Sequence, residues 1–179
     1  MNEMTFFDLS AHDLDGNEIP FSRFHGSICM VVNTSSKGID KYELRKLSSL
    51  QEQFRSRGLK ILAFPCRQFI KREKKNNNKI KKKYYEKEKL KFNVFGITKV
   101  NGENSHLVFK WLKSRAGNVL GRSIEWNFTK FIITNDGKSV KRLSSAVDYD
   151  SIIAIFDEIL PKETPGESTI QECEIAQQF

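Results

Sequence analysis

The side chains best suited to nucleophilic chemistry in this chain are three cysteines, Cys29, Cys66 and Cys173. A thiolate attacks electrophiles, but a thiol with the ordinary pKa of about 8.5 is mostly protonated at neutral pH. Cys29 lies inside an apolar run, which indicates a buried structural residue, and Cys66 follows Pro65 at the expected end of another strand. Cys173 lies in a polar C-terminal segment where nothing nearby lowers its pKa. The immediate surroundings therefore single out none of the three as an activated nucleophile.

The spacing of the cysteines, histidines and glycines argues against several other kinds of site. Three widely separated cysteines form neither the disulfide framework of a small secreted domain nor a Cys-x-x-Cys motif. His12 and His25 have no partners at metal-ligand spacing, so we expect no metal site. Gly102 and Gly137 are typical of turns, and no glycine-rich nucleotide motif is present. We expect no bound cofactor.

Three short motifs occur in a fixed order along the chain. Residues 64–69 read Phe-Pro-Cys-Arg-Gln-Phe, residues 100–102 read Val-Asn-Gly, and residues 125–131 read Glu-Trp-Asn-Phe-Thr-Lys-Phe. They resemble the Phe-Pro-Cys-Asn-Gln-Phe, Val-Asn-Gly and Lys-Trp-Asn-Phe-Thr-Lys-Phe motifs of the glutathione peroxidase family. The similarity extends from about Phe6 to about Leu160. It implies a thioredoxin-like fold and a glutathione peroxidase-type oxidoreductase, which reduces hydrogen peroxide or organic and lipid hydroperoxides in the oxidative stress response.

A fourth motif resembles the active-site loop of this family but lacks its reactive residue. In the family a strand runs into Asn-Val-Ala-Ser-Lys, followed by cysteine or selenocysteine and then glycine, whereas here Lys37 is followed directly by Gly38. The separation of Gly38 from Cys66 fits the plant or phospholipid-hydroperoxide type of loop with one residue removed. In the other possible alignment Gly38 replaces the nucleophile and Ile39 stands where the glycine belongs. The first alignment suggests that a selenocysteine, whose codon is usually read as a stop, is absent from the printed sequence.

The resemblance assigns the remaining site residues. In the family the sulfur or selenium is surrounded by a glutamine amide, an indole N–H and an asparagine amide, which match Gln68, Trp126 and Asn127; Gly38 marks the place of the nucleophile. An indole only donates hydrogen bonds and an amide NH2 group also donates, so all three suit an anionic centre. Taken singly, Trp126 at the start of an apolar strand is typical of a core residue, and the two amides are typical of loops.

The reductant also follows from the resemblance. Thioredoxin-dependent members of the family carry a resolving cysteine in the helix after the glutamine motif, and this position falls near Tyr84 or Tyr85 here. Because no cysteine stands there, the resemblance implies that glutathione or another external thiol would complete the cycle. The expected partners are therefore a hydroperoxide substrate and a small thiol.

Charge is concentrated in one segment, Lys71 to Lys91, which holds eleven basic residues against three glutamates and accounts for the net charge of +8. It could be a solvated surface, or it could attract anionic glutathione or an anionic membrane surface. Nucleic acid is not an expected partner, because no recognised nucleic-acid-binding fold surrounds Tyr84 and Tyr85. The alternative function is a catalytically inactive pseudo-peroxidase that acts as a binding or scaffold domain through this 71–91 segment.

The hydrophobic pattern predicts an α/β fold with a central mixed sheet flanked by helices and an N-terminal β-hairpin. With 179 residues and 39% apolar content, the chain suits a single domain over residues 1–160 and a flexible tail over residues 161–179. No signal peptide or membrane span is evident, so we expect a cytoplasmic protein.

The expected elements are a hairpin turn at Asp15-Gly16, strands at Ser27–Asn33 and Leu59–Phe64, helices at Asp40–Gly58, within Asn77–Lys89 and at Ser105–Ser114, a hairpin of Trp126–Thr134 with Lys138–Leu143, and a last helix through Ile152–Leu160.

Overall fold

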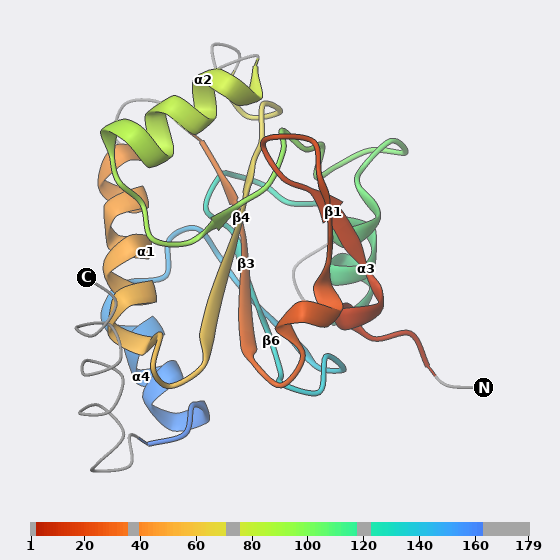
Figure 1. Cartoon of the computed structure of the whole chain (residues 1–179). Coiled ribbons are helices and arrows are strands. Elements are labelled where there is room, and N and C mark those ends of the chain that lie inside the picture. The colour runs from red at the N-terminus through yellow and green to blue at the C-terminus, as the bar shows by residue number, and fades with distance from the viewer. Residues whose placement is uncertain (1–2, 36–39, 71–75, 118–122, 163–179) are drawn as a thin grey trace, which may run out of the picture.

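A mixed five-stranded sheet forms the centre of the protein in the computed structural model, which describes residues 3–35, 40–70, 76–117 and 123–162. The strand order is β5-β4-β3-β6-β7. The middle strand, β3, pairs in parallel with β4 and antiparallel with β6 (Figure 1). A separate antiparallel hairpin, β1 and β2, precedes the sheet in the chain. The strand bounds are Ser10–His12 for β1, Glu18–Pro20 for β2, Ile28–Thr34 for β3, Leu59–Pro65 for β4, Asn93–Val94 for β5, Lys130–Ile133 for β6 and Val140–Leu143 for β7.

Helices cover both faces of the sheet (Figure 1). On one face lie α1, Asp40–Phe54, and α4, Tyr149–Ile159; on the other lie α3, Leu107–Arg115, and the N-terminal hairpin. The short helix α2, Asn77–Lys81, continues into a π-helical turn, Lys82–Lys87, at the end of the sheet where β3 and β4 finish. Three-residue and four-residue 3-10 turns occupy Phe6–Asp8 and Phe21–Phe24.

The alternation of side chains along β3 explains why that strand is apolar throughout. Met30 and Val32 point into the core beneath α1 and α4, whereas Cys29 and Val31 point into the core beneath α3 and the N-terminal segment. A strand buried on both faces has no polar side, as is usual in a sheet covered by helices on both faces. This central position places the end of β3, at Asn33 and Thr34, in the interior of the molecule.

Most of the expected elements are confirmed, including the N-terminal hairpin, β3, α1, β4, α3 and α4. One expectation is wrong: Trp126–Thr129 is not part of a strand, and β6 begins only at Lys130. The cause is Phe128, whose φ of 64° is incompatible with an extended backbone. In α4 the expected apolar stripe is only partly buried, because Ile159 is 41% exposed. The side chain of Asp40, expected to cap α1, lies outside the described residues, as does the tail beyond Lys162.

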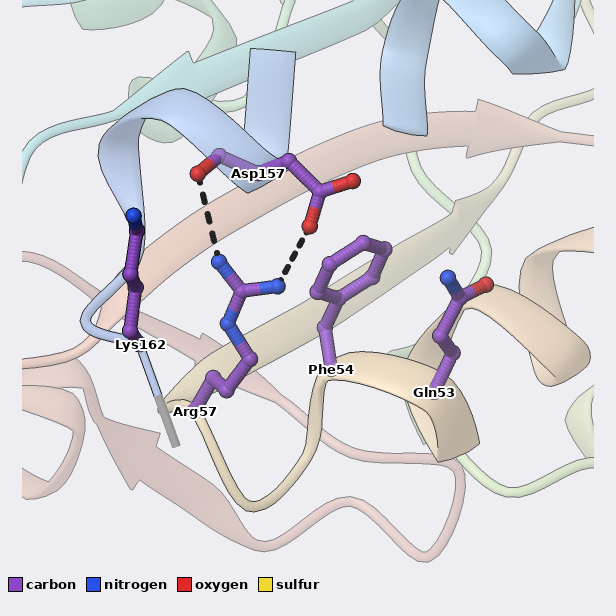
Figure 2. A pocket seen from close by; sticks show the side chains of 5 residues that line it. All are labelled: Gln53, Phe54, Arg57, Asp157 and Lys162. Atoms are coloured by element: carbon purple, nitrogen blue, oxygen red, sulfur yellow. Dashed lines mark hydrogen bonds and ion pairs between the residues drawn. The ribbon is translucent and has the colours of Figure 1, made fainter. Parts of the chain in front are cut away.

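An arginine joins the ends of the two helices on the α1 face (Figure 2). The guanidinium of Arg57 forms an ion pair with Asp157 and donates to main-chain carbonyls at the end of α4, including that of Pro161 at 2.8 Å. These groups, with Gln53, Phe54 and Lys162, line a pocket of about 420 Å³. The guanidinium N–H groups already donate to these carbonyl and carboxylate oxygens. Arg57 therefore caps the C-terminus of α4. Among the described residues, no helix has the length and apolar character needed to cross a membrane.

Candidate active site

Asn33, at the end of β3, holds the segment that carries two of the expected site residues. Its side-chain Nδ2 donates to the main-chain carbonyl of Trp126 at 3.1 Å, and its own main-chain carbonyl accepts from the Phe128 N–H at 2.7 Å. Asn33 is fully buried, and its Oδ1 has no hydrogen-bond partner. Two contacts from a rigid central strand therefore fix residues 126–128.

The same segment is braced from its own C-terminal side. The Thr129 hydroxyl donates to the carbonyl of Trp126 at 3.0 Å, and the Lys130 ammonium donates to the carbonyl of Phe128 at 2.8 Å. These contacts accompany the left-handed backbone of Phe128, an unfavourable conformation for a bulky residue. A backbone held in such a conformation is a frequent feature of functional sites.

Asn127 lies between these anchors and is only 1% exposed. Neither Nδ2 nor Oδ1 of its amide has a hydrogen-bond partner. A buried unsatisfied polar group costs roughly 1–3 kcal/mol, so native proteins retain few of them. The Asn127 amide is buried, and the backbone on both sides of it is held in place. Its N–H groups remain available to donate to a bound molecule, as expected of a site residue.

Gln68 has a different environment, because its side chain fastens a neighbouring loop. Its Oε1 accepts from the N–H groups of Val100 and Asn101 at 2.6 and 2.9 Å, and its Nε2 donates to the carbonyl of Asn101 at 3.0 Å. The side chain of Asn101 in turn exchanges two hydrogen bonds with the backbone of Ile124, at 2.7 and 2.8 Å. Gln68 is thus linked through Asn101 to the segment that leads into Trp126. One of its two amide N–H bonds remains for a ligand.

Trp126 is not a core residue, since it is 53% exposed. Its ring lies 6.0 Å from the ring of Phe69, centroid to centroid, so the Phe-Pro-Cys-Arg-Gln-Phe and Trp-Asn-Phe motifs touch. Within the described parts of the chain, the indole N–H of Trp126 donates to no neighbour, and an exposed indole can donate to a bound molecule. Gly38, the expected mark of the nucleophile, lies outside the described residues between β3 and α1.

The two cysteines among the described residues are both buried. Burial raises the pKa of Cys29 to about 12, which keeps this residue a neutral thiol at physiological pH. Cys66 lies at the end of β4, where its Sγ accepts from the Gln68 N–H at 3.5 Å and its own N–H donates to Thr34. The third, Cys173, lies outside the described residues. In the described ranges, His, Cys, Asp and Glu side chains form no group of three that could hold a metal ion.

Two side chains near these motifs were not singled out by the sequence as parts of the site. Tyr84 is fully buried, and its hydroxyl lies 3.2 Å from the Thr34 hydroxyl at the end of β3. Tyr84, one of the two positions expected for a resolving cysteine, therefore packs against the end of β3. Lys130, which holds Phe128, is also fully buried. Lys130 belongs to the motif over residues 125–131, but a lysine is usually a surface residue, so the residue type does not predict its burial.

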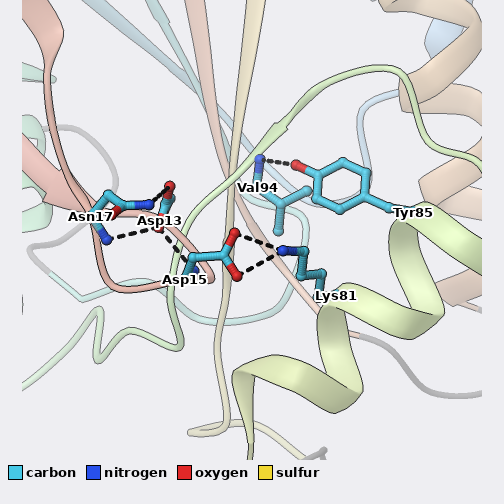
Figure 3. Close-up of polar contacts among 6 residues, drawn as sticks. All are labelled: Asp13, Asp15, Asn17, Lys81, Tyr85 and Val94. Atoms are coloured by element: carbon cyan, nitrogen blue, oxygen red, sulfur yellow. Dashed lines mark hydrogen bonds and ion pairs between the residues drawn. The ribbon is translucent and has the colours of Figure 1, made fainter.

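Ion pairs engage both signs of charge in the described part of the basic segment: Lys81 is neutralised by a carboxylate outside the segment, whereas Glu88 pairs with cations of α1. Lys81 of α2 contacts the carboxylate of Asp15 in the β1–β2 turn at 2.6 Å (Figure 3). Glu88 contacts both Lys41 and Arg45 of α1, at 3.3 and 3.1 Å. Residues 71–75 of the segment lie outside the described residues. The ion pairs join this segment to α1 and to the N-terminal hairpin.

Comparison with solved structures places the protein in the thioredoxin-like class. The crystal structure of Trgpx in apo form aligns with a TM-score of 0.73 at 31% identity, over 88% of this chain and 96% of that chain. A thiol:disulfide interchange protein of the thioredoxin family from Chlorobium tepidum aligns with a TM-score of 0.58 at 16% identity, over 87% and 97%. The second likeness concerns the fold alone.

Sequence comparison gives the family. A family model described as glutathione peroxidase matches residues 6–113, more than half of the chain. A probable glutathione peroxidase 2 from Arabidopsis thaliana is 37% identical over 78% of this chain and 83% of its own length. A probable phospholipid hydroperoxide glutathione peroxidase from Mesembryanthemum crystallinum is 38% identical over 81% and 86%. The chain belongs to the glutathione peroxidase family, whose members are thiol-dependent oxidoreductases of the peroxidase type.

Proposed function

We propose that this protein reduces hydrogen peroxide or organic and lipid hydroperoxides, and that its nucleophile is a selenocysteine between Lys37 and Gly38 that the printed sequence omits. The observation that carries the proposal is the amide of Asn127, which is buried yet unpaired. A fold keeps such a group at a cost in stability. An anionic selenium or sulfur beside it would accept its hydrogen bond and would account for its retention.

The proposed reaction proceeds in two stages. A selenolate attacks one oxygen of the hydroperoxide, the O–O bond breaks, and the leaving alkoxide takes a proton to become an alcohol or water. The oxidised selenium, a selenenic acid, is then reduced by two thiols in turn: the first releases water and forms a mixed selenyl sulfide, and the second releases a disulfide. Asn127, the indole of Trp126 and the remaining N–H of Gln68 would donate to the selenolate and to the developing alkoxide.

The reductant in this proposal is glutathione or another external thiol. Tyr84 stands near the position of a resolving cysteine, and it is buried with its hydroxyl close to Thr34. The hydroxyl of Tyr85 is also hydrogen-bonded, because it accepts from the Val94 N–H at 3.0 Å (Figure 3). Neither side chain offers a second thiol, so a small diffusible thiol in a reducing compartment such as the cytoplasm would complete the cycle.

A second candidate function is a binding or scaffold domain that has lost catalysis. The observation in its favour is the exposure of several lysines on the basic segment beyond the ion-paired Lys81. Lys79, Lys82, Lys87, Lys89 and Lys91 are exposed. They would attract an anionic membrane surface. Binding to anionic liposomes that falls steeply with added salt would support this candidate, and binding that ignores salt would remove it.

Three measurements decide between these candidates, two of them on protein isolated from its natural source and one on its transcript. The intact mass should exceed the mass calculated from the 179 printed residues by one selenocysteine or cysteine residue. The transcript should carry an in-frame UGA between the Lys37 and Gly38 codons, and the protein should consume peroxide only when a thiol is supplied. A mass equal to that of the printed chain, together with no thiol-dependent peroxide consumption, would overturn the catalytic proposal.

A further inference from the structure

Lys130 is a lysine without solvent contact on β6, a strand with neighbours on both sides. It begins β6, opposite Val32 of β3 and Leu143 of β7, and its exposed fraction is 0%. It shares a face of the sheet with Ile132, beneath α1 and α4. Lysine is almost never fully buried unless a partner compensates its charge.

Among the described residues, the groups around the Lys130 ammonium are polar, but none of them carries a negative charge in direct contact with it. Its hydrogen bond goes to the carbonyl of Phe128, and the ring centroid of Tyr149 in α4 lies 5.8 Å from its Nζ. The Tyr149 hydroxyl donates to the carboxylate of Glu43 in α1 at 3.2 Å, and the Lys46 ammonium lies 4.6 Å from the same ring. Glu43 and Lys130 do not form an ion pair. The Lys130 ammonium is therefore held chiefly by the Phe128 carbonyl and the Tyr149 ring.

The carbonyl that Lys130 holds belongs to the residue with the most unusual backbone in the site. Phe128 has a φ of 64°, its N–H is bonded to the Asn33 carbonyl, and its own carbonyl is bonded to Lys130. Both ends of this peptide segment are therefore anchored. The residue immediately before it is Asn127, whose unpaired amide carries the proposed function.

We propose that Lys130 is a positioning residue for the peroxidase site: its charged ammonium fixes the left-handed turn at Phe128 and so orients the segment from Trp126 to Asn127. The proposal rests on the proposed function. It assigns Lys130 no contact with substrate. Its action passes through the backbone of Phe128, and loss of the positive charge would weaken a charge-assisted hydrogen bond.

This arrangement makes the segment sensitive to pH. Burial lowers the pKa of Lys130 to about 8, with the charge of Glu43 acting to raise it and that of Lys46 acting to lower it. Burial and Glu43 raise the pKa of Tyr149, so the tyrosine stays neutral over the same range. On the neighbouring strand β7, Lys141 is exposed. As the pH rises through about 8, Lys130 loses its proton and the hold on Phe128 loosens.

Fluorine NMR of the full chain labelled with 5-fluorotryptophan tests this proposal without any need for turnover. The chain has two tryptophans, Trp111 and Trp126, and the variant W126F assigns their resonances. The Trp126 resonance should shift with a midpoint near pH 8 in the unmodified protein. The shift should be absent in K130R, because arginine stays charged, and in K130M, because methionine does not titrate.

The variant K141M is the matched control, since it removes an exposed lysine from the neighbouring strand and should leave the transition unchanged. If K130M does not fold, the unmodified protein and K130R decide the question. A Trp126 resonance that shows no transition near pH 8, or a transition that persists in K130R, would overturn the role of Lys130 and leave the peroxidase proposal standing. A Lys130-dependent transition in natural-source protein that consumes no peroxide would instead count against the peroxidase proposal alone.

Discussion

The side-chain amide of Asn33 donates to the main-chain carbonyl of Trp126 across 93 positions of sequence. This single contact joins the end of the central strand, which leads toward the proposed position of the nucleophile, to the segment that carries Trp126 and Asn127. The Asn33 carbonyl holds Phe128 of the same segment. Asn33, at the start of the motif that resembles the family's active-site loop, and the Trp-Asn-Phe motif are thus parts of one hydrogen-bonded unit.

Replacing Asn33 by alanine should therefore destabilise the protein. The substitution leaves the carbonyl of Trp126 with only the Thr129 hydroxyl and removes a buried side chain, which should lower the free energy of unfolding by roughly 1–3 kcal/mol. Urea unfolding followed by circular dichroism measures the change. The variant Asn93→Ala, in an exposed position of β5, is the control and should change stability by less than about 0.5 kcal/mol. Equal effects of the two substitutions would contradict the assigned role of Asn33.

Gln68 offers a substitution that separates its two roles. In Gln68→Glu the carboxylate can still accept from the N–H groups of Val100 and Asn101, but it cannot donate. We expect the free energy of unfolding to fall by about 1 kcal/mol, because the bond to the Asn101 carbonyl is lost and a carboxylate oxygen then faces that carbonyl at an exposed position. The rate of peroxide reduction should fall by about 100-fold if the remaining N–H stabilises the anion.

The measurement for Gln68→Glu is the steady-state rate with peroxide and thiol, alongside urea unfolding of the same preparation. Gln68→Ala serves as the comparison, because it removes both the fastening of residues 100–101 and the donor, and should lower stability as well as rate. A Gln68→Glu variant with the full rate would show that Gln68 serves only to fasten that loop.

Lys130 should also affect how stability varies with pH. Its pKa in the folded protein, about 8, lies below the ordinary value of 10.5, so between these values the unfolded chain binds more protons than the folded one. The free energy of unfolding should therefore rise with pH above about 8, by roughly 1–3 kcal/mol toward pH 10, in the unmodified protein relative to Lys130→Met. Urea unfolding at a series of pH values measures this difference. Parallel pH profiles for the two proteins would show that Lys130 does not titrate in this range.

Glu88 should contribute a small, salt-dependent stabilisation. Its carboxylate is only 7% exposed and contacts Lys41 and Arg45, but these two partners are 48% and 61% exposed. We expect Glu88→Gln to lower the free energy of unfolding by about 0.2–1 kcal/mol at low salt, and by less at high salt, because exposed cations are screened. The exposed Glu86, changed to glutamine, is the matched control. An effect of Glu88→Gln that is independent of salt would argue against an electrostatic origin.

The sequence predicts the elements whose pattern is local and fails where distant contacts decide the backbone. The apolar positions of α1, including Leu44, Leu47 and Phe54, are buried as expected. The segment Trp126–Thr129 has the composition of a strand, yet Asn33 and Lys130 hold it in a turn. Asn33 and Lys130 belong to the motifs that resemble the family, but both positions are typical of a strand, so the local sequence predicts neither contact.

The same limit applies to the site. Motif order predicts Gln68, Trp126 and Asn127 as site residues, and the structure links their segments through Phe69 and Asn101. The motifs do not predict that the Gln68 amide is hydrogen-bonded to the backbone of residues 100–101, or that the Asn127 amide is unpaired. The full burial of Lys130 also could not be predicted, because lysine is usually an exposed residue.

Asn127→Leu removes the unpaired amide while keeping a side chain of similar length. Because a buried unsatisfied amide is destabilising, this variant should be as stable as the unmodified protein or more stable, by up to about 2 kcal/mol. Unfolding in urea checks this expectation. The conservative variant Asn127→Gln, in which the longer amide must fit the same buried space, should be less stable because of overpacking.

The most direct test of the account is the rate of thiol-dependent peroxide reduction by Asn127→Leu, compared with the unmodified protein in its form containing the nucleophile. The account predicts a loss of about 100-fold or more with no loss of stability, because the amide is retained for an anion and not for the fold. An unchanged rate in a variant of equal or greater stability would contradict it.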